Sequence, residues 1–246
     1  FFRLGDFYEM FNEDAILGSR ELEITLTARQ KDSPNPIPMC GVPHHAAANY
    51  IARLVRKGYR VAVCEQTEDA AKGVKLVKRE VVRVITPGTA IDPQLVESKD
   101  SVYLASICGS GDTFAAAFLE LSAGQFSTTQ ISGAGSWDKV RDQIEAFSPR
   151  EILFPRSLER EVLSAFGASQ DNLLFADESP STGGLATLTP QENENFGFDD
   201  CSDLLKTQFG VKELTAFGLD GKKDSIRAGG ACLRYARETQ KTIAGH

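Results

Sequence analysis

A phenylalanine and a glutamate two residues apart form the most specific chemical pattern in this sequence. Phe7 and Glu9 follow the turn residues Gly5-Asp6. Side chains at i and i+2 of a β-strand project from one face, so Phe7 and Glu9 would share a face and Tyr8 would point the other way. An aromatic ring beside a carboxylate on a rigid hairpin can stack on a nucleic-acid base and hydrogen-bond to its edge.

Two ordinary structures fit the same residues. Asp6 and Glu9 have the spacing of a helix capping box, with Asp6 as the N-cap. A surface strand with one buried aromatic residue fits as well. Spacing alone therefore leaves a base-contacting hairpin, a helix start and a plain surface strand open.

Motifs for other chemistry are absent from the sequence. Gly221-Lys222-Lys223 lacks both the earlier glycine and the following Ser or Thr of a phosphate-binding loop, so ATP binding by that route is not expected. His44 and His45 are adjacent and would chelate a metal poorly. We predict no catalytic residue, no metal ligand and no cofactor in this chain.

The cysteines and the lack of a long apolar run indicate a cytoplasmic protein. The five cysteines are scattered and contain no C-x-x-C pair, which favours free thiols in a reducing compartment over disulfides or zinc. No apolar run approaches the roughly 20 residues of a membrane span, and no signal peptide is present. We expect no membrane partner.

The charge balance argues at first against a simple nucleic-acid binder, because the formal net charge is −7. The charges are distributed unevenly. Residues 1–98 hold 13 basic and 13 acidic side chains, whereas residues 99–246 hold 14 and 21. The excess negative charge therefore belongs to the second part, where a protein partner is a better fit than DNA.

Hydrophobic periodicity and turn residues predict two mixed α/β units. In the first, we expect strands at 1–4, 7–11, 24–27, 60–66 and 80–86, helices at 12–22 and 46–57, and a proline-rich loop at 30–43. In the second, we expect strands at 102–108, 113–121, 125–131, 149–155 and 172–175, and helices at 136–147, 158–166, 201–209 and 225–243. Residues 176–198 are expected to be mobile and without regular structure. Nothing follows the last helix for it to pack against, so we expect the chain to be truncated on its C-terminal side.

Several blocks resemble a known family. Residues 2–11, Phe2-Arg3-Leu4-Gly5-Asp6-Phe7-Tyr8-Glu9-Met10-Phe11, closely resemble the start of the mismatch-recognition domain of the MutS family of DNA mismatch-repair proteins. The resemblance continues in order through Leu26-Thr27-Ala28-Arg29, residues 37–46, Val61-Ala62-Val63-Cys64-Glu65-Gln66 and residues 82–89. Residues from about 100 to 220 resemble the family's connector domain, and residues 228–233 and 239–242 are similar to the start of its lever helices.

The resemblance implies an α/β (α+β) fold of two mixed-sheet domains. Residues 1–98 would form the mismatch-recognition domain, and residues 99–222 a ribonuclease-H-like connector. Residues 223–246 would begin the helical lever region. Because the chain starts at Phe1 without Met, we expect it to be a fragment of a longer bacterial protein.

The resemblance also implies roles for individual residues. Phe7 would wedge beside a mispaired or unpaired base, and Glu9 would hydrogen-bond to that base. Leu4, Gly5 and Asp6 would shape the wedge loop, and Arg29 could reach the DNA backbone. Glu9 is expected to take up a proton in the complex, because phosphate charge and desolvation both disfavour its ionised form.

The implied partners are mismatched double-stranded DNA and MutL, the latter through the connector domain. The full-length protein would be a homodimer and an ATPase that uses ATP and Mg²⁺, although this chain holds no ATP-binding loop. Two other functions stay open. A ribonuclease-H-like, metal-dependent nuclease would use carboxylates such as Asp112 and Glu120, and a protein-interaction fragment would not bind DNA at all.

Overall fold

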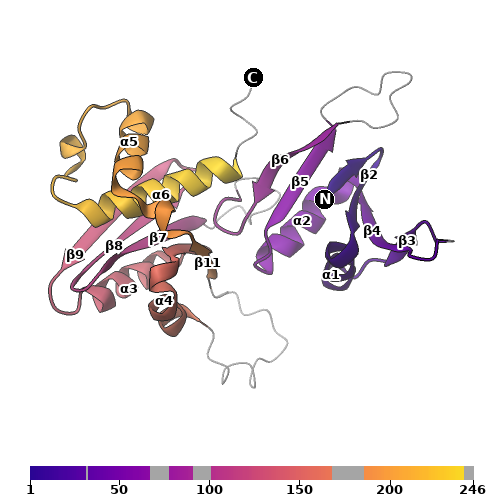
Figure 1. Cartoon of the computed structure of the whole chain (residues 1–246), viewed down its shortest axis with the longest axis horizontal. Coiled ribbons are helices and arrows are strands. Elements are labelled where there is room, and N and C mark those ends of the chain that lie inside the picture. The colour runs from indigo at the N-terminus through magenta and orange to yellow at the C-terminus, as the bar shows by residue number, and fades with distance from the viewer. Residues whose placement is uncertain (32, 67–77, 91–100, 168–185, 241–246) are drawn as a thin grey trace. The chain divides into compact units, whose positions relative to one another are not determined.

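The computed structural model describes residues 1–31, 33–66, 78–90, 101–167 and 186–240. The chain forms two compact units, one built mainly from Phe1–Thr86 and the other from Ser101–Glu238 together with Pro87–Thr89. Each unit has its own mixed β-sheet with helices packed against it (Figure 1). The α+β class with two mixed sheets, predicted from the sequence, is therefore confirmed.

The first unit contains a six-stranded sheet in the order β3-β4-β2-β1-β5-β6. Its strands are β1 (Phe2–Leu4), β2 (Phe7–Phe11), β3 (Thr27–Arg29), β4 (Ile37–Pro43), β5 (Val61–Gln66) and β6 (Arg79–Ile85). Only β1 and β5 pair in parallel among these neighbours. The β1–β2 hairpin therefore lies at the centre of the sheet, with paired strands on both sides.

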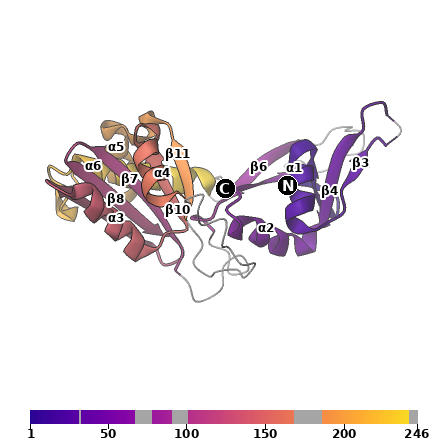
Figure 2. The ribbon, with the colours of Figure 1, turned by 90° about the horizontal axis from the view of Figure 1, so that it is seen from below.

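Two helices cover one face of this sheet. Helix α1 (Asn12–Leu22) packs on β2 and β4, and α2 (Ala47–Arg56) follows the short 3-10 helix η1 (His44–Ala46) and packs on β4 and β5 (Figure 2). Their apolar residues share one core with the inward side chains of the sheet, among them Tyr8 and Met10. The opposite face of the sheet, which carries Phe7, has no helix of this unit packed against it among the described residues.

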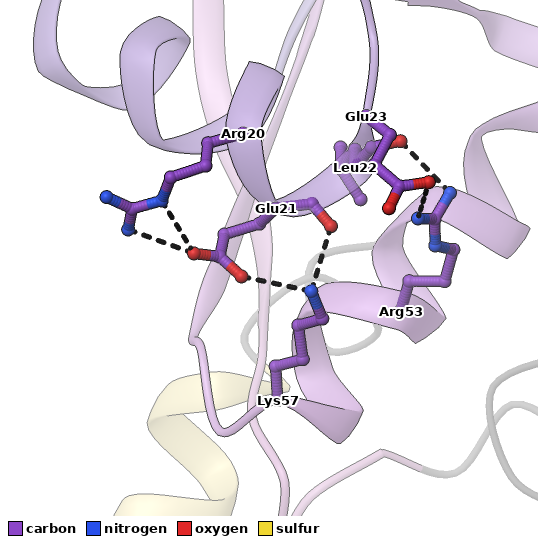
Figure 3. A network of polar contacts seen from close by, with 6 residues as sticks. All are labelled: Arg20, Glu21, Leu22, Glu23, Arg53 and Lys57. Carbon is purple, nitrogen blue, oxygen red and sulfur yellow. Dashed lines mark hydrogen bonds and ion pairs between the residues drawn. The ribbon is translucent and has the colours of Figure 1, made fainter. Parts of the chain in front are cut away.

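Arg53, in the last turn of α2, and Lys57, just after that helix, hold the C-terminal end of α1 (Figure 3). The Lys57 ammonium donates to the backbone carbonyl of Glu21 and to its carboxylate, both at 3.0 Å. Arg53 donates to the Leu22 carbonyl at 3.1 Å and lies 3.8 Å from the carboxylate of Glu23. Positive charge is favourable at a helix C-terminus, where carbonyl groups lack partners within the helix. These contacts fix the two helices against each other behind the hairpin.

Two of the predicted elements in this unit were wrong. Residues 37–43 form strand β4 and not a proline-rich loop, because Cys40 and Val42 are buried against the helices while β2 and β3 supply pairing on both sides. The strand expected at 24–27 lies instead at Thr27–Arg29. Prolines argue against a central strand, and here the tertiary pairing outweighs them.

The second unit contains a five-stranded sheet in the order β11-β10-β7-β8-β9. Its strands are β7 (Tyr103–Ser110), β8 (Thr113–Glu120), β9 (Gln125–Ser132), β10 (Glu151–Pro155) and β11 (Thr187–Gln191). The first three form an antiparallel meander, and β10 and β11 add in parallel on the other side of β7. This is the meander followed by alternating helix and strand that the sequence predicted.

Helices cover both faces of the second sheet (Figure 1). Their bounds are α3 (Ser136–Phe147), α4 (Glu159–Phe166), α5 (Phe198–Phe209) and α6 (Lys223–Thr239). Helices α3 and α4 share a core with one set of alternate strand residues, including Ile107 and Ile152. Helix α6 shares a second core with the other set, including Leu104 and Leu153. The last helix thus packs against strands that precede it in the chain.

Strand β11 corrects another prediction. Residues 187–191 were expected to lack regular structure, yet they pair in parallel with all of β10. Thr-Leu-Thr-Pro-Gln is a weak strand sequence, so the partner strand decides its conformation. The strand predicted at 172–175 lies outside the described residues. Across the described part of the chain, no helix combines the length and the apolar character that crossing a membrane requires.

Candidate nucleic-acid interface

The hairpin tip presents Phe7 beside a two-residue turn. Leu4 and Phe7 are cross-strand partners, and Gly5-Asp6 joins them. Gly5 has a φ of +59°, which a two-residue hairpin turn with glycine at its first central position requires. The backbone N–H of His44 donates to the Asp6 carbonyl at 2.8 Å. The turn is thereby tied to the end of β4.

Alternate residues of β2 face opposite sides, as predicted. Phe7 is 48% exposed, whereas Tyr8 and Met10 are buried in the core. The Tyr8 hydroxyl donates to the carboxylate of Glu65 on β5, and burial is the largest cause of its raised pKa, followed by Glu65. The exposed ring therefore stands on a strand whose other face is anchored. Because residues 7–11 form a strand, the capping-box interpretation of Asp6 and Glu9 is wrong.

Glu9 lies on the same face as Phe7, directly opposite Gly41 of β4. A Cβ at Gly41 would lie 3.4 Å from Cγ of Glu9 and 3.2 Å from the carbonyl oxygen of Tyr8. The missing side chain leaves room for Glu9 above β4. From strand β3, Nη1 of Arg29 lies 3.8 Å from Oε2 of Glu9. Two residues of the predicted site that are distant in sequence thus meet on the sheet.

The same face carries further aromatic rings, which the sequence interpretation did not include. Phe2 pairs with Glu9 across the hairpin and is 41% exposed. Its ring centroid lies 6.0 Å from that of Phe11, and the Arg29 guanidinium lies 5.8 Å from the Phe11 ring centroid. The period-two alternation and the hairpin register were the signals that could have identified Phe2 and Phe11. The structure therefore enlarges the apolar surface around Phe7.

The two carboxylates named for a nuclease do not form a metal site. Glu120 is buried and accepts from the backbone N–H groups of Ser122 and Ala123, which fixes the turn after β8. Asp112 precedes the other end of the same strand, so a separation of about 25 Å follows from the rise of about 3.3 Å per residue. Within the described ranges, no group of three or more His, Cys, Asp or Glu residues could hold a metal ion.

Comparison with known proteins identifies the chain's relatives. The family model for MutS domain I matches residues 1–94, and the model for MutS domain II matches residues 102–246. This chain belongs to the MutS family. The resemblance carried by the hairpin residues is therefore confirmed, and the hairpin lies in domain I of the family.

Curated MutS proteins match the whole chain. "DNA mismatch repair protein MutS" of Solibacter usitatus is 43% identical over 245 residues, and that of Myxococcus xanthus is 41% identical over 246. The protein of the same name from Methanococcoides burtonii is 38% identical over 250 residues. Each match covers 100% of this chain and 26% of the relative. The chain thus spans about a quarter of the length of the curated MutS proteins that it matches.

Proposed function

We propose that this chain recognises mispaired DNA through the β1–β2 hairpin, as part of a mismatch-repair protein. The observation that carries the proposal is the half-exposed Phe7 ring beside Glu9, on a strand whose other face is buried. Membership of the MutS family supports it, because the relatives are named for DNA mismatch repair. Phe7 would enter beside a mispaired or unpaired base, and Glu9 would hydrogen-bond to that base.

The energetics of a wedge favour defective base pairs. Unstacking a step costs a few kcal/mol, and it costs least where pairing is already lost. Stacking a base on an aromatic ring returns about 1–3 kcal/mol. The preference for a mismatch then follows from the deformability of the DNA and does not require one base identity.

The remaining assignments complete this proposal. Residues 1–98 would be the mismatch-recognition domain, residues 99–222 the connector that relays to MutL, and residues 223–246 the start of the lever region. Leu4, Gly5 and Asp6 would shape the tip that enters the DNA. The full-length protein would be a cytoplasmic homodimer whose other domains bind ATP and Mg²⁺. Those domains would also supply much of the grip on phosphates, which fits the net charge of −7 of this chain.

The test is Phe7→Ala in the full-length protein, with affinity measured for a mismatched and a matched duplex at one salt concentration. We expect mismatch affinity to fall by about tenfold or more, since a stacking contact is lost. Matched-duplex affinity should change little, so the preference would disappear. Phe217→Ala is the matched control, because Phe217 is similarly exposed, at 51%, but lies in the second unit. An unchanged preference in Phe7→Ala would overturn the proposal and favour a protein-interaction role.

A further inference from the structure

Arg29 is held beside Glu9 by the architecture of the sheet. It lies on edge strand β3, while Glu9 lies on β2, with β4 between them. Arg29 is opposite Ile37 of β4, whereas Glu9 is opposite Gly41, so the guanidinium reaches along β4 toward Glu9. Its Nη1 reaches 3.8 Å from Oε2 of Glu9. The pairing of β4 with both β2 and β3 thus brings these two charges together.

A second contact keeps Arg29 on the face of the sheet that carries Phe7 and Glu9. The Arg29 guanidinium carbon lies 5.8 Å from the centroid of the Phe11 ring, within the range of a cation–π interaction. Phe11 follows Glu9 by two residues and shares its face. Glu9 and Phe11 together place the positive charge on the side of the sheet from which Phe7 projects.

The positive charge of Arg29 beside Glu9 bears on how the hairpin can approach DNA. The Phe7 ring can enter a base step only if the Glu9 carboxylate comes close to the phosphates, which repel it. We propose that Arg29 is a positioning residue for Glu9. It offsets the carboxylate's charge as the hairpin meets DNA and stays beside Glu9 while that side chain contacts a base edge. This inference rests on the proposed function and assigns Arg29 an action through Glu9, in place of an independent contact to the DNA backbone.

Both side chains of the Arg29–Glu9 pair are partly exposed to solvent. The Arg29 side chain is 54% exposed and that of Glu9 is 21% exposed. Ion pairs near solvent add little to folding stability, since water screens them and two long side chains lose freedom. A substitution of Arg29 should therefore leave the fold intact, and a change in DNA affinity can be assigned to the interface.

The test is a double-mutant cycle in the full-length protein, with Arg29→Ala, Glu9→Gln and the double variant, measured on a mismatched duplex. We expect Arg29→Ala to weaken binding by about threefold to fivefold, the upper range for a partly exposed pair. In the Glu9→Gln background, the same change should have less than about half of this effect, because no negative charge remains to be offset. Arg29→Lys should restore most of the affinity.

Arg56→Ala provides the matched control. Arg56 is exposed on α2, which packs against the other face of the sheet. Arg56→Ala should therefore change DNA affinity by the same factor in the wild-type background and in the Glu9→Gln background. Equal losses for Arg29→Ala in both backgrounds would overturn the inference and leave a direct phosphate contact. Phe7→Ala distinguishes a failure of this inference from a failure of the proposed function. If only the inference about Arg29 fails, Phe7→Ala still abolishes the mismatch preference.

Discussion

The Tyr235 hydroxyl donates a 2.6 Å hydrogen bond to Oε1 of Glu151, a carboxylate with no exposed surface. Thr189 donates to the same oxygen at 2.8 Å, and the backbone N–H of Gly88 donates to the other oxygen at 3.0 Å. One buried side chain thus joins α6, β10, β11 and the short segment Pro87–Thr89. Burying a carboxylate is costly unless donors surround it, and these three donors offset part of that cost.

Tyr235→Phe should lower the free energy of unfolding by about 1.5–3 kcal/mol, the size of a hydrogen bond to a charged group. Urea denaturation followed by fluorescence measures the effect. Thr189→Val removes a hydroxyl from the same oxygen without changing the side-chain shape much, and it should destabilise by a similar amount. Wild-type stability in both variants would show that the carboxylate is satisfied in another way.

Glu9→Gln should retain mismatch binding in the full-length protein. The amide still offers a hydrogen bond to a base but carries no charge to repel phosphates. Matched-duplex affinity should rise, so discrimination should fall. Fluorescence anisotropy with both duplexes measures this. Glu13→Gln, on the exposed first turn of α1, is the control and should leave discrimination as it is. Complete loss of mismatch binding in Glu9→Gln would show that binding requires the negative charge of Glu9, and it would contradict this prediction.

Lys57→Met should lower the unfolding temperature at neutral pH. The Lys57 ammonium, together with the Arg20 guanidinium, lowers the pKa of Glu21 in the folded protein. A lowered folded-state pKa stabilises the fold above the unfolded-state pKa, near 4.3, and this contribution is lost as the pH falls through the folded-state pKa. The difference between Lys57→Met and wild type should therefore shrink below about pH 4.

Calorimetry between pH 3 and pH 7 would check this dependence, with Lys31→Met as a control, an exposed lysine of the same unit. We expect the control to give a small difference that does not vary with pH. A Lys57→Met difference that stayed constant over the same range would show that the Glu21 carboxylate contributes nothing to the link between α1 and α2.

All five cysteines should resist alkylation in the native protein. Each is buried, and burial raises the pKa of each thiol, to about 12 for Cys108. Because the thiolate is the nucleophile, iodoacetamide at pH 8 should modify them far more slowly before unfolding than after it. Peptide-resolved mass spectrometry would measure each site. Rapid labelling of Cys108 in the native protein would show that its side chain is accessible and not buried.

Local sequence patterns were sufficient to predict the turn and strands that carry Phe7 and Glu9. Gly5-Asp6 predicted a turn, and the flanking aromatic residues favoured strands. The two-residue period of a strand predicted that Phe7 and Glu9 share a face. These features depend on neighbours within a few residues, where backbone sterics and side-chain alternation decide. The meander of the second unit followed from the same kind of local signal.

The distant residues that join Phe7 and Glu9 on the sheet come together through long-range strand pairing. Strand β4 forms in spite of its prolines because β2 and β3 pair with it, and that strand brings Gly41 and Arg29 to Glu9. In the same way, β11 forms because it pairs with β10. The Glu151 carboxylate is buried where Tyr235, Thr189 and Gly88, from three separate segments, donate hydrogen bonds to it. Such contacts join residues far apart in the chain. Their free energy comes from pairing and burial in the folded state, which a local sequence pattern does not contain.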